Sequence, residues 1–201
     1  IAARLKNVNG TIADYYDGAS VLFADVVDFT PLSAKMTPVE LVERLNEGVS
    51  DFDRRTAKIG LEKIKTIGEG SLVASGAPQP RADHALALPP QAFELQEVDA
   101  NRQYQGHKLG IRRGINSGPV VAGVIGSQKF AYDLWGDAVN TASRMESHGK
   151  DGNIQTTRAT YDLIKDDFVC EPQGTVNVKG KGEMDVWYIT GARDELSRTT
   201  T

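Results

Sequence analysis

An aspartate interrupts an apolar segment near the start of the chain. The run from residue 21 to 27, Val-Leu-Phe-Ala-Asp-Val-Val, has the composition of a buried strand, with Asp25 inside it. A carboxylate among apolar side chains is unfavourable unless a cation or several donors compensate. Asp25 therefore predicts a divalent metal site at a strand end, because Mg²⁺ prefers hard oxygen ligands. The alternative is a turn carboxylate that caps the Thr30-Pro31 segment.

Two polar residues further along the chain have the spacing of neighbours on one helix face. The segment from Asp137 to Ser147 is predicted to be helical, and it contains Asn140 and Arg144. Side chains four residues apart on a helix project from the same face. The amide and the guanidinium can therefore reach one ligand.

The elements that position these residues begin with a capped helix. Thr37-Pro-Val-Glu has the pattern of a capping box with proline at the first helical position, so a long helix should follow. Gly60 is expected to end that helix. Two short strands are then predicted at 61–67 and 71–74, joined by a tight turn that carries Glu69.

Prolines and glycines divide the second half of the chain. Residues 83–105 have a mostly helical composition, but Pro89-Pro90 should kink or split that helix because proline removes backbone donors. Gly118-Pro119 is expected to mark a turn between two strands. The other predicted elements are those strands at 109–116 and 120–126, the helix at 137–147, a strand near Ile154, a helix at 158–165 and strands near Phe168 and Val186. This alternation, without repeats, indicates an α/β sandwich.

The composition indicates one domain that lacks the charge for binding a polynucleotide. A chain of 201 residues with 40% hydrophobic content fits a single domain with a substantial core. Its formal charge of −4 gives a nucleic-acid partner no electrostatic support, although a nucleotide is still a suitable ligand. The single cysteine, Cys170, cannot form an internal disulfide, which suits a reducing cytosol. No apolar run reaches the ~20 residues needed to span a bilayer.

Several segments are similar, in the same order, to those of one enzyme family. After the strand at 21–30 they are Leu61-Glu-Lys-Ile-Lys-Thr-Ile-Gly-Glu, Gly114-Ile-Asn-Ser-Gly-Pro-Val-Val-Ala-Gly, Tyr132-Asp-Leu-Trp-Gly-Asp-Ala-Val-Asn-Thr-Ala-Ser-Arg-Met and Asn177-Val-Lys-Gly-Lys-Gly. Between Ser20 and Tyr188 the chain thus resembles the catalytic domain of class III nucleotidyl cyclases, of the bacterial adenylyl cyclase type. Each segment alone is a weak signal, whereas all of them in order are a specific one. The resemblance implies a ferredoxin-like, palm-type α/β (α+β) fold, with a mostly antiparallel sheet and flanking helices.

The resemblance also implies domain boundaries. Residues 20–190 should form the cyclase catalytic domain and 191–201 a C-terminal tail. Residues 1–19 should be the end of an upstream connecting helix and a linker, since Ile1-Ala-Ala-Arg-Leu-Lys begins abruptly without a cap. In the family such a helix comes from a sensor or membrane segment, so we expect an upstream regulatory part.

A site for two divalent cations, Mg²⁺ or Mn²⁺, follows from the resemblance. Asp25 and Glu69 match the family's two carboxylate positions, and the carbonyl of Val26 is a further ligand. The family normally has aspartate where this chain has Glu69. The longer side chain displaces the carboxylate, whereas Mg²⁺ tolerates little departure from octahedral contacts near ~2.1 Å, so weaker affinity or a preference for Mn²⁺ is a hypothesis. The alternative is that Glu69 is a solvated turn residue.

The nucleotide contacts are also implied by the resemblance. Lys65 and Asp133 match the base-reading pair, in which lysine donates to N1 of adenine and aspartate accepts from its N6 amine; guanine reverses this pattern. Asn140 matches the asparagine that positions the ribose, and Arg144 the arginine that stabilises negative charge on the attacked phosphorus. The remaining matches are Phe29 and Thr30 in the backbone cradle of the triphosphate, and Arg112 and Lys179 at the β and γ phosphates.

The implied activity is that of an adenylyl cyclase, in which the ribose 3′ hydroxyl of ATP attacks the α-phosphorus to give 3′,5′-cyclic AMP and pyrophosphate. The family builds each site from two chains, so the expected partners are ATP and a second copy in a symmetric homodimer, without nucleic acid. The expected location is cytoplasmic, as a free domain or as the cytosolic part of a membrane-anchored protein. The alternative is a nucleotide-binding regulatory module without turnover. It is suggested by Glu69, by Asp28 where the family commonly has glycine, and by Pro89-Pro90 in a helix that is usually unbroken.

Overall fold

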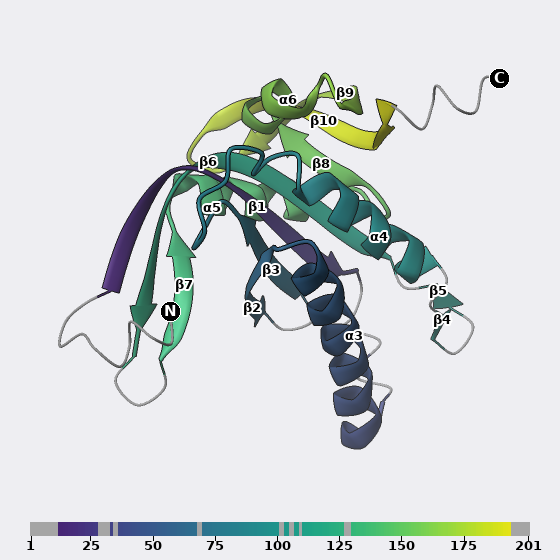
Figure 1. Ribbon diagram of the computed structural model, residues 1–201. Coiled ribbons are helices and arrows are strands. Elements are labelled where there is room, and N and C mark those ends of the chain that lie inside the picture. The colour runs from purple at the N-terminus through teal and green to yellow at the C-terminus, as the bar shows by residue number, and fades with distance from the viewer. Residues whose placement is uncertain are drawn as a thin grey trace.

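One large sheet organises the computed structural model, which describes residues 12–27, 33, 36–67, 70–100, 103–104, 107–108, 110–126 and 130–193. Its strands lie in the order β2-β3-β1-β6-β8-β10-β9, and β7 pairs with the far part of β6 (Figure 1). Only the β6–β8 pair is parallel among these described strands. The strands are β1 (Ile12–Val26), β2 (Glu62–Ile67), β3 (Gly70–Ser75), β6 (Ile111–Ile125), β7 (Ala131–Trp135), β8 (Ile154–Thr157), β9 (Phe168–Val178) and β10 (Gly182–Ala192), with a separate small hairpin of β4 (Gln103–Tyr104) and β5 (His107–Lys108).

Buried side chains alternate between the two faces of this sheet. Val21 of β1 packs on one face with Leu72 of β3, whereas Leu22 packs on the other face with Val73. Successive side chains of a strand point to opposite faces, so a continuous apolar run is typical of a strand covered on both sides. The predicted fold, a mostly antiparallel sheet with flanking helices, is confirmed.

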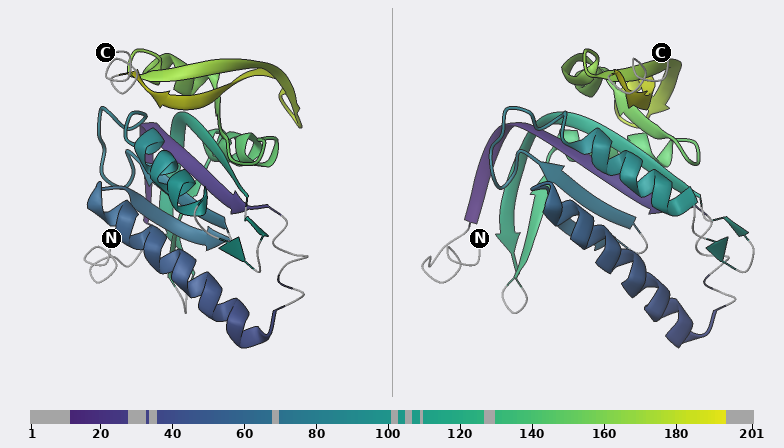
Figure 2. Two further views of the ribbon diagram at one scale, coloured as in Figure 1. Left: turned by 90° about the vertical axis from the view of Figure 1, so that its right-hand side faces the viewer. Right: turned by 45° about the vertical axis from the view of Figure 1, so that its right-hand side comes forward.

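Helices cover both faces of the sheet. The helices are α3 (Pro38–Lys58), α4 (Leu88–Ala100), α5 (Asp137–Ser147) and α6 (Arg158–Ile164). Leu88 and Ala92 of α4 join the apolar cluster of Leu22, and Ala138 of α5 joins that of Val21 on the opposite face. Figures 1 and 2 show α3 beside β2, extending beyond the sheet. None of the described helices is both long and apolar enough to cross a membrane.

The start of α3 has the predicted capping box. The backbone N–H of Thr37 donates to Glu40 Oε2 at 2.8 Å, and the N–H of Glu40 donates to Thr37 Oγ1 at 3.3 Å. Pro38 is the first helical residue, where its missing N–H removes no intrahelical bond. The helix ends at Lys58, and Gly60 follows with a φ of 67°.

Helix α4 begins at the two prolines and is not broken by them. The predicted kinked or split helix over 83–105 is wrong, because residues 82–87 form turns and the helix starts at Leu88. Pro89 and Pro90 then lie in the first turn, where N–H groups have no intrahelical acceptor. The prolines therefore favour the start of this helix.

Strand β6 continues through Gly118-Pro119, where a turn between two strands was expected. In β1, Tyr16 pairs with Val120 and Ala19 pairs with Gly118, so two residues of β1 lie opposite Pro119 alone. This is a β-bulge, and a bulge accommodates a proline that cannot donate to the ladder. The predicted turn is thus a bend in one long strand.

Strand β1 also begins earlier than expected. Residues 12–19 are part of β1 and not a linker, since Ile12 to Tyr16 pair with Val124 to Val120. The sequence Ile12-Ala-Asp-Tyr-Tyr-Asp does not alternate between apolar and polar residues, so this half of the strand lacks the pattern by which a strand is recognised. Gly191 and Ala192, which were expected in the C-terminal tail, belong to β10. Residues 1–11 and 194–201 lie outside the described ranges, so the upstream helix and the rest of the tail stay predictions.

Candidate active site

Asp25 lies at the end of β1, directly opposite Arg112 of β6. The register of the two strands pairs Asp25 with Arg112 and Val26 with Ile111. Arg112 Nη2 is 3.6 Å from Asp25 Oδ2, and the two side chains are 30% and 32% exposed respectively. The carboxylate that was predicted to hold a metal therefore has a cationic neighbour and lies partly at the surface.

A buried acid of α5 holds the same arginine. Arg112 Nε donates to Glu146 Oε1 at 2.8 Å, and Glu146 is buried near the end of the helix. Burial raises the pKa of Glu146 above its usual value of 4.5, although the hydrogen bond and charge of Arg112 oppose that shift. Sequence reasoning missed this residue. The available signal was its place on the buried face of α5, four residues after Ala142.

The close approach of α5 to β6 depends on a glycine. A Cβ atom on Gly114 would lie 2.0 Å from the backbone nitrogen of Glu146 and 2.6 Å from the carbonyl oxygen of Ala142. Only glycine therefore fits between strand and helix at this point. This contact brings Glu146 within reach of Arg112 in the same strand.

Lys65 and Asp133 meet although they are 68 residues apart in the sequence. Lys65 Nζ lies 2.5 Å from Asp133 Oδ2, which joins β2 to β7. The other carboxylate oxygen, Oδ1, accepts the backbone N–H of Leu134 at 2.8 Å. Asp133 is thus held by its own backbone, while Lys65 is 41% exposed. The pair presents a donor and an acceptor side by side.

The other predicted nucleotide contacts lie on α5 and on the turn between β9 and β10. Asn140 and Arg144 are exposed and one helical turn apart, and Lys179 is exposed in the turn. Lys181 of that turn forms an ion pair of 2.5 Å with Asp137, the first residue of α5. This ion pair holds the turn beside the helix that carries Asn140 and Arg144.

Part of the predicted site lies outside the described ranges. This is the case for Asp28, Phe29 and Thr30 of the triphosphate cradle and for Glu69 of the metal site. Among the residues that the structure does describe, no three His, Cys, Asp or Glu side chains form a metal-binding group. Asp25 with the carbonyl of Val26 still fits Mg²⁺ in donor type, because this ion commonly takes one or two carboxylates and completes its shell with phosphate oxygens and water.

The chain is similar to known nucleotide cyclases over nearly its whole length. The model of the adenylate and guanylate cyclase catalytic domain matches residues 12–191. An adenylate cyclase of Mycobacterium tuberculosis (strain ATCC 25618 / H37Rv) is 48% identical over 195 residues, covering 96% of this chain and 44% of the relative. The chain therefore spans less than half the length of that relative.

Solved structures agree with this match. The guanylate cyclase domain of RhGC from Catenaria anguillulae, in complex with GTP, has a TM-score of 0.86 and 36% identity, covering 90% of this chain and 100% of that one. The adenylyl cyclase CyaB from P. aeruginosa has a TM-score of 0.79 and 27% identity, covering 90% and 97%. The chain belongs to the adenylate and guanylate cyclase catalytic domain family.

Proposed function

We propose that this domain is an adenylyl cyclase that converts ATP to 3′,5′-cyclic AMP and pyrophosphate. The fold does not separate ATP from GTP, because similar structures include both adenylyl and guanylate cyclases. The observation that carries the choice is the Lys65–Asp133 pair at 2.5 Å. Its ammonium group donates to N1 of adenine and its carboxylate accepts from N6. The 48% identity to a mycobacterial adenylate cyclase supports the same choice.

Guanine would be rejected because its hydrogen-bonding edge is reversed. Its O6 is an acceptor that would face Asp133, and its N1–H is a donor that would face Lys65. Once the nucleotide and a partner chain exclude water from this pair, a wrong base would leave polar groups without partners, which costs about 1–3 kcal/mol for each buried group. Asp133 is held in place by the N–H of Leu134, so it cannot readily turn away from a mismatched base.

Divalent cations complete the proposed site. The family uses divalent metals, and Asp25, the Val26 carbonyl and Glu69 would hold Mg²⁺ or Mn²⁺ in this chain. When bound, such ions lower the pKa of the 3′ hydroxyl and neutralise the charge of the leaving phosphates. The longer side chain of Glu69 favours the less demanding Mn²⁺.

The chain's own residues bind and orient the nucleotide. Arg112 and Lys179 would bind the β and γ phosphates, with Phe29 and Thr30 in the cradle beside them. Asn140 would hold the ribose so that its 3′ hydroxyl faces the α-phosphorus. Arg144 would donate to the phosphorus oxygens as negative charge develops, a contribution of about 3 kcal/mol for one such group.

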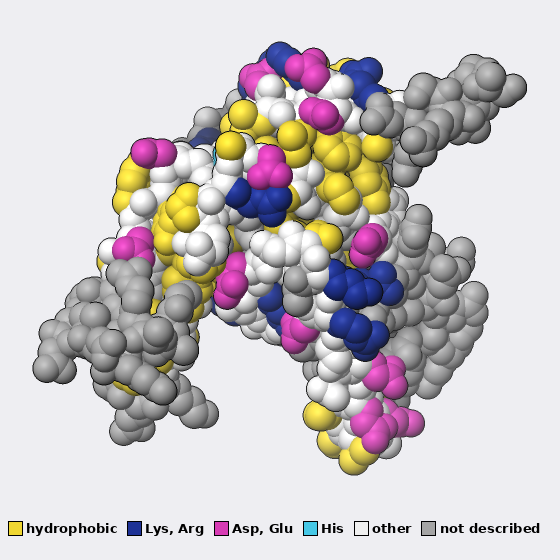
Figure 3. All heavy atoms as spheres, in the orientation of Figure 1, with side chains coloured by type: hydrophobic (Ala, Val, Ile, Leu, Met, Phe, Trp, Pro, Cys, Tyr) yellow, Lys and Arg dark blue, Asp and Glu magenta, His cyan; other side chains and the backbone are white. Residues whose placement is uncertain are grey.

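A second copy of the chain is proposed to complete each site. Cyclase domains of this family act as dimers, and this chain carries both the metal residue Asp25 and the base-reading pair. Exposed hydrophobic side chains lie on β1, β6, β7 and the segment before β7, and Figure 3 shows hydrophobic side chains on this part of the molecule. They are Tyr15, Val121, Ile125, Phe130 and Trp135. Such a patch marks a protein interface, and a symmetric dimer would pair it with its own copy.

A regulatory or membrane segment in the full-length protein is also proposed. The curated adenylate cyclase relative is more than twice as long as its matched part, since the match covers 44% of it. Such a segment would leave the catalytic domain in the cytoplasm, where its ATP is found.

The proposed function is tested by product formation from ATP and GTP. Cyclic AMP and cyclic GMP would be measured with Mg²⁺ and with Mn²⁺ over a dilution series of the purified chain. We expect cyclic AMP, with a specific activity that rises with protein concentration because each site needs two copies. Absence of product at high concentration, while ATP still binds, would replace the enzyme by a nucleotide-binding regulatory module.

The shared site has a separate test. Asp25→Ala and Arg144→Ala proteins, each nearly inactive, should recover activity when mixed, because a mixed dimer contains one intact site. Failure to recover activity in verified mixed dimers would contradict a site built from two chains.

A further inference from the structure

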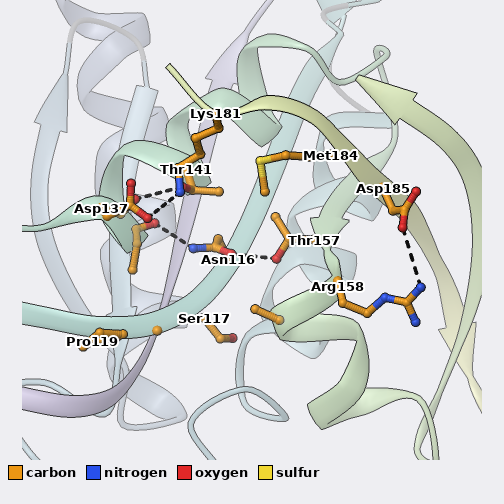
Figure 4. A pocket seen from close by; sticks show the side chains of 13 residues that line it. Asn116, Ser117, Pro119, Asp137, Thr141, Thr157, Arg158, Lys181, Met184 and Asp185 are labelled. Carbon is orange, nitrogen blue, oxygen red and sulfur yellow. Dashed lines mark hydrogen bonds and ion pairs between the residues drawn. The ribbon is translucent and has the colours of Figure 1, made fainter. Parts of the chain in front are cut away.

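A pocket lies between the start of α5, the start of α6 and the hairpin of β9 and β10 (Figure 4). Its volume is about 490 Å³, within the ~300–1,000 Å³ typical of small-molecule sites. None of the residues proposed above to bind the nucleotide or metal lines it. Ala138, Ala159 and Met184 supply apolar walls. The pocket is thus distinct from the nucleotide site.

The floor of the pocket is made of buried polar side chains with fixed partners. Asn116 is 5% exposed and Thr157 is 1% exposed. Thr157 Oγ1 donates to Asn116 Oδ1 at 2.6 Å, and Asn116 Nδ2 donates to the carbonyl of Ala138 at 2.9 Å. That nitrogen has a second N–H, and the described residues supply no acceptor for it. The floor is therefore rigid and retains a donor for a ligand oxygen.

One wall carries an oriented guanidinium. Arg158 lies over the ring of Trp187 at 4.6 Å, and Trp187 is itself stacked on Tyr161 with ring centroids 4.7 Å apart. The nearest acid is Asp185, whose carboxylate lies 3.7 Å away, beyond hydrogen-bond distance. Within the described part of the chain, Arg158 makes no hydrogen bond. Stacking thus fixes the plane of the guanidinium while its N–H groups stay available for a bidentate partner.

We propose that this pocket binds a small organic carboxylate with an apolar body. The carboxylate would accept two parallel hydrogen bonds from Arg158, the geometry that a guanidinium fork favours. The body of the ligand would pack on Met184, Ala138 and Ala159. A ligand that carries a further oxygen would place it at the second N–H of Asn116. Both cations of the wall have an acid partner: Lys181 Nζ is 2.5 Å from Asp137, whereas Arg158 Nη2 is 3.7 Å from Asp185. Arg158 is therefore the less tightly paired cation and the one that selects the anion.

The position of the pocket gives such a ligand a regulatory role. One wall is the first turn of α5, which carries Asn140 and Arg144 further along, and another is the hairpin whose turn carries Lys179. A ligand between them bridges the two elements that present ribose and phosphate contacts. This consequence rests on the cyclase function proposed above, whereas binding itself does not.

Binding is tested with the methyl groups of methionine. The chain has three methionines, Met36, Met145 and Met184, and only Met184 lines the pocket. Phenylacetate and benzoate would be titrated into protein labelled at the methionine methyl groups, with phenylacetamide as the uncharged control. We expect a saturable shift of the Met184 signal and none of the Met36 signal. Arg158→Gln should weaken binding about tenfold, since the variant removes the positive charge and the paired N–H donors. Lys150→Gln, which changes an exposed lysine outside the pocket, should leave binding unchanged.

Several results would overturn the proposal. They are no saturable shift with either carboxylate up to about 10 mM, equal affinity of the Arg158→Gln protein, or equal affinity for phenylacetamide. Unchanged Met36 and Met145 signals show that Arg158→Gln is folded. Cyclic AMP formation would then be measured with saturating phenylacetate in both proteins. A change confined to the wild type supports regulation, and no change overturns it; if the protein makes no cyclic AMP, the methyl signals still decide the binding.

Discussion

Changing Asp133 to asparagine should alter the choice of base while leaving the fold intact. In the structure Asp133 Oδ1 accepts the N–H of Leu134 at 2.8 Å, and Oδ2 faces Lys65 at 2.5 Å. Asparagine has the same shape, and its oxygen can keep the bond to Leu134. Its amide group then takes the place of Oδ2, which replaces an acceptor by a donor. The exposed end of the pair thus changes its hydrogen-bonding sense.

The magnitude follows from the bond that is lost. An adenine N6 amine that donates to a carboxylate makes a charge-assisted hydrogen bond of about 1.5–3 kcal/mol. In the Asp133→Asn variant the N6 amine faces the side-chain amide N–H groups instead, so two donors meet and no hydrogen bond forms. We therefore expect kcat/KM for ATP to fall about 10- to 150-fold. The new amide donor matches O6 of guanine, so kcat/KM for GTP should not fall in parallel. Lost ion pairing with Lys65 should change the free energy of unfolding by only about 0–1 kcal/mol, because Lys65 is 41% exposed.

The assay measures cyclic AMP and cyclic GMP from equal mixtures of ATP and GTP, so that the two substrates compete for one enzyme preparation. Asp53→Asn is the matched control. It removes the acid from another 2.5 Å ion pair, with Lys63 of the same strand β2. The control should keep the wild-type ratio of the two products.

An unchanged ratio of products in folded Asp133→Asn protein would refute the assignment of this pair to base reading. A proportional loss with both substrates would also refute it, because that result indicates a structural role. An equal change of ratio in Asp53→Asn protein would show that β2 as a whole, and not the carboxylate of Asp133, determines the substrate.

Three further predictions concern the stability of the fold, the pH dependence of that stability and the reactivity of the single cysteine. Gly114→Ala should lower the free energy of unfolding, measured by urea denaturation, by about 3 kcal/mol or more, because the added Cβ would collide with the backbone of α5. Gly191→Ala is the control and should have a small effect, because a Cβ at Gly191 would meet nothing within 4 Å. Because burial raises the pKa of Glu146, the folded state binds more protons than the unfolded state, and the free energy of unfolding should decline as pH rises from about 4.5 through the folded pKa. Glu146→Gln protein should lack this decline; the same pH profile in both proteins would contradict the prediction. Burial raises the pKa of Cys170 to about 11, so little of the thiol is ionised at neutral pH in the folded protein. Iodoacetamide should therefore modify Cys170 far more slowly in folded than in urea-unfolded protein, and equal rates would contradict this prediction.

Sequence patterns predicted the helices whose starts and ends are determined by residues within the helix itself. Helix α5 has the predicted bounds of 137–147, and the capping box of Thr37 starts α3 as expected, because each signal lies within one turn of the residue it governs. Strand β6 was divided wrongly at Pro119, because the bulge that accommodates it lies on a partner strand about a hundred positions earlier. The outer half of β1 was missed for a similar reason: its pairing is fixed by the partner strand and not by its own alternation.

Contacts of the candidate site were predictable only where a family pattern supplied them. Composition and spacing could not have joined Lys65 to Asp133, since they come together only after β2 and β7 are placed by the sheet. Asp25 was recognisable because a carboxylate in an apolar strand is a local conflict. Glu146, which binds Arg112, is likewise an acid on the buried face of a helix. It was missed because the family pattern assigns a role to Arg144 and none to Glu146.

The charges around Asp25 bear on the order in which ligands bind. Arg112 lies between two carboxylates, Asp25 at 3.6 Å and Glu146 at 2.8 Å, so these three described side chains carry two negative charges and one positive charge. A triphosphate that arrives alone would compete with both acids for one guanidinium. Because the negative charge of Asp25 repels a phosphate even at a partly exposed site, phosphate binding at Arg112 is more favourable when a cation neutralises Asp25. Nucleotide and divalent cation should therefore bind with positive linkage, and Glu146 keeps Arg112 oriented until they do.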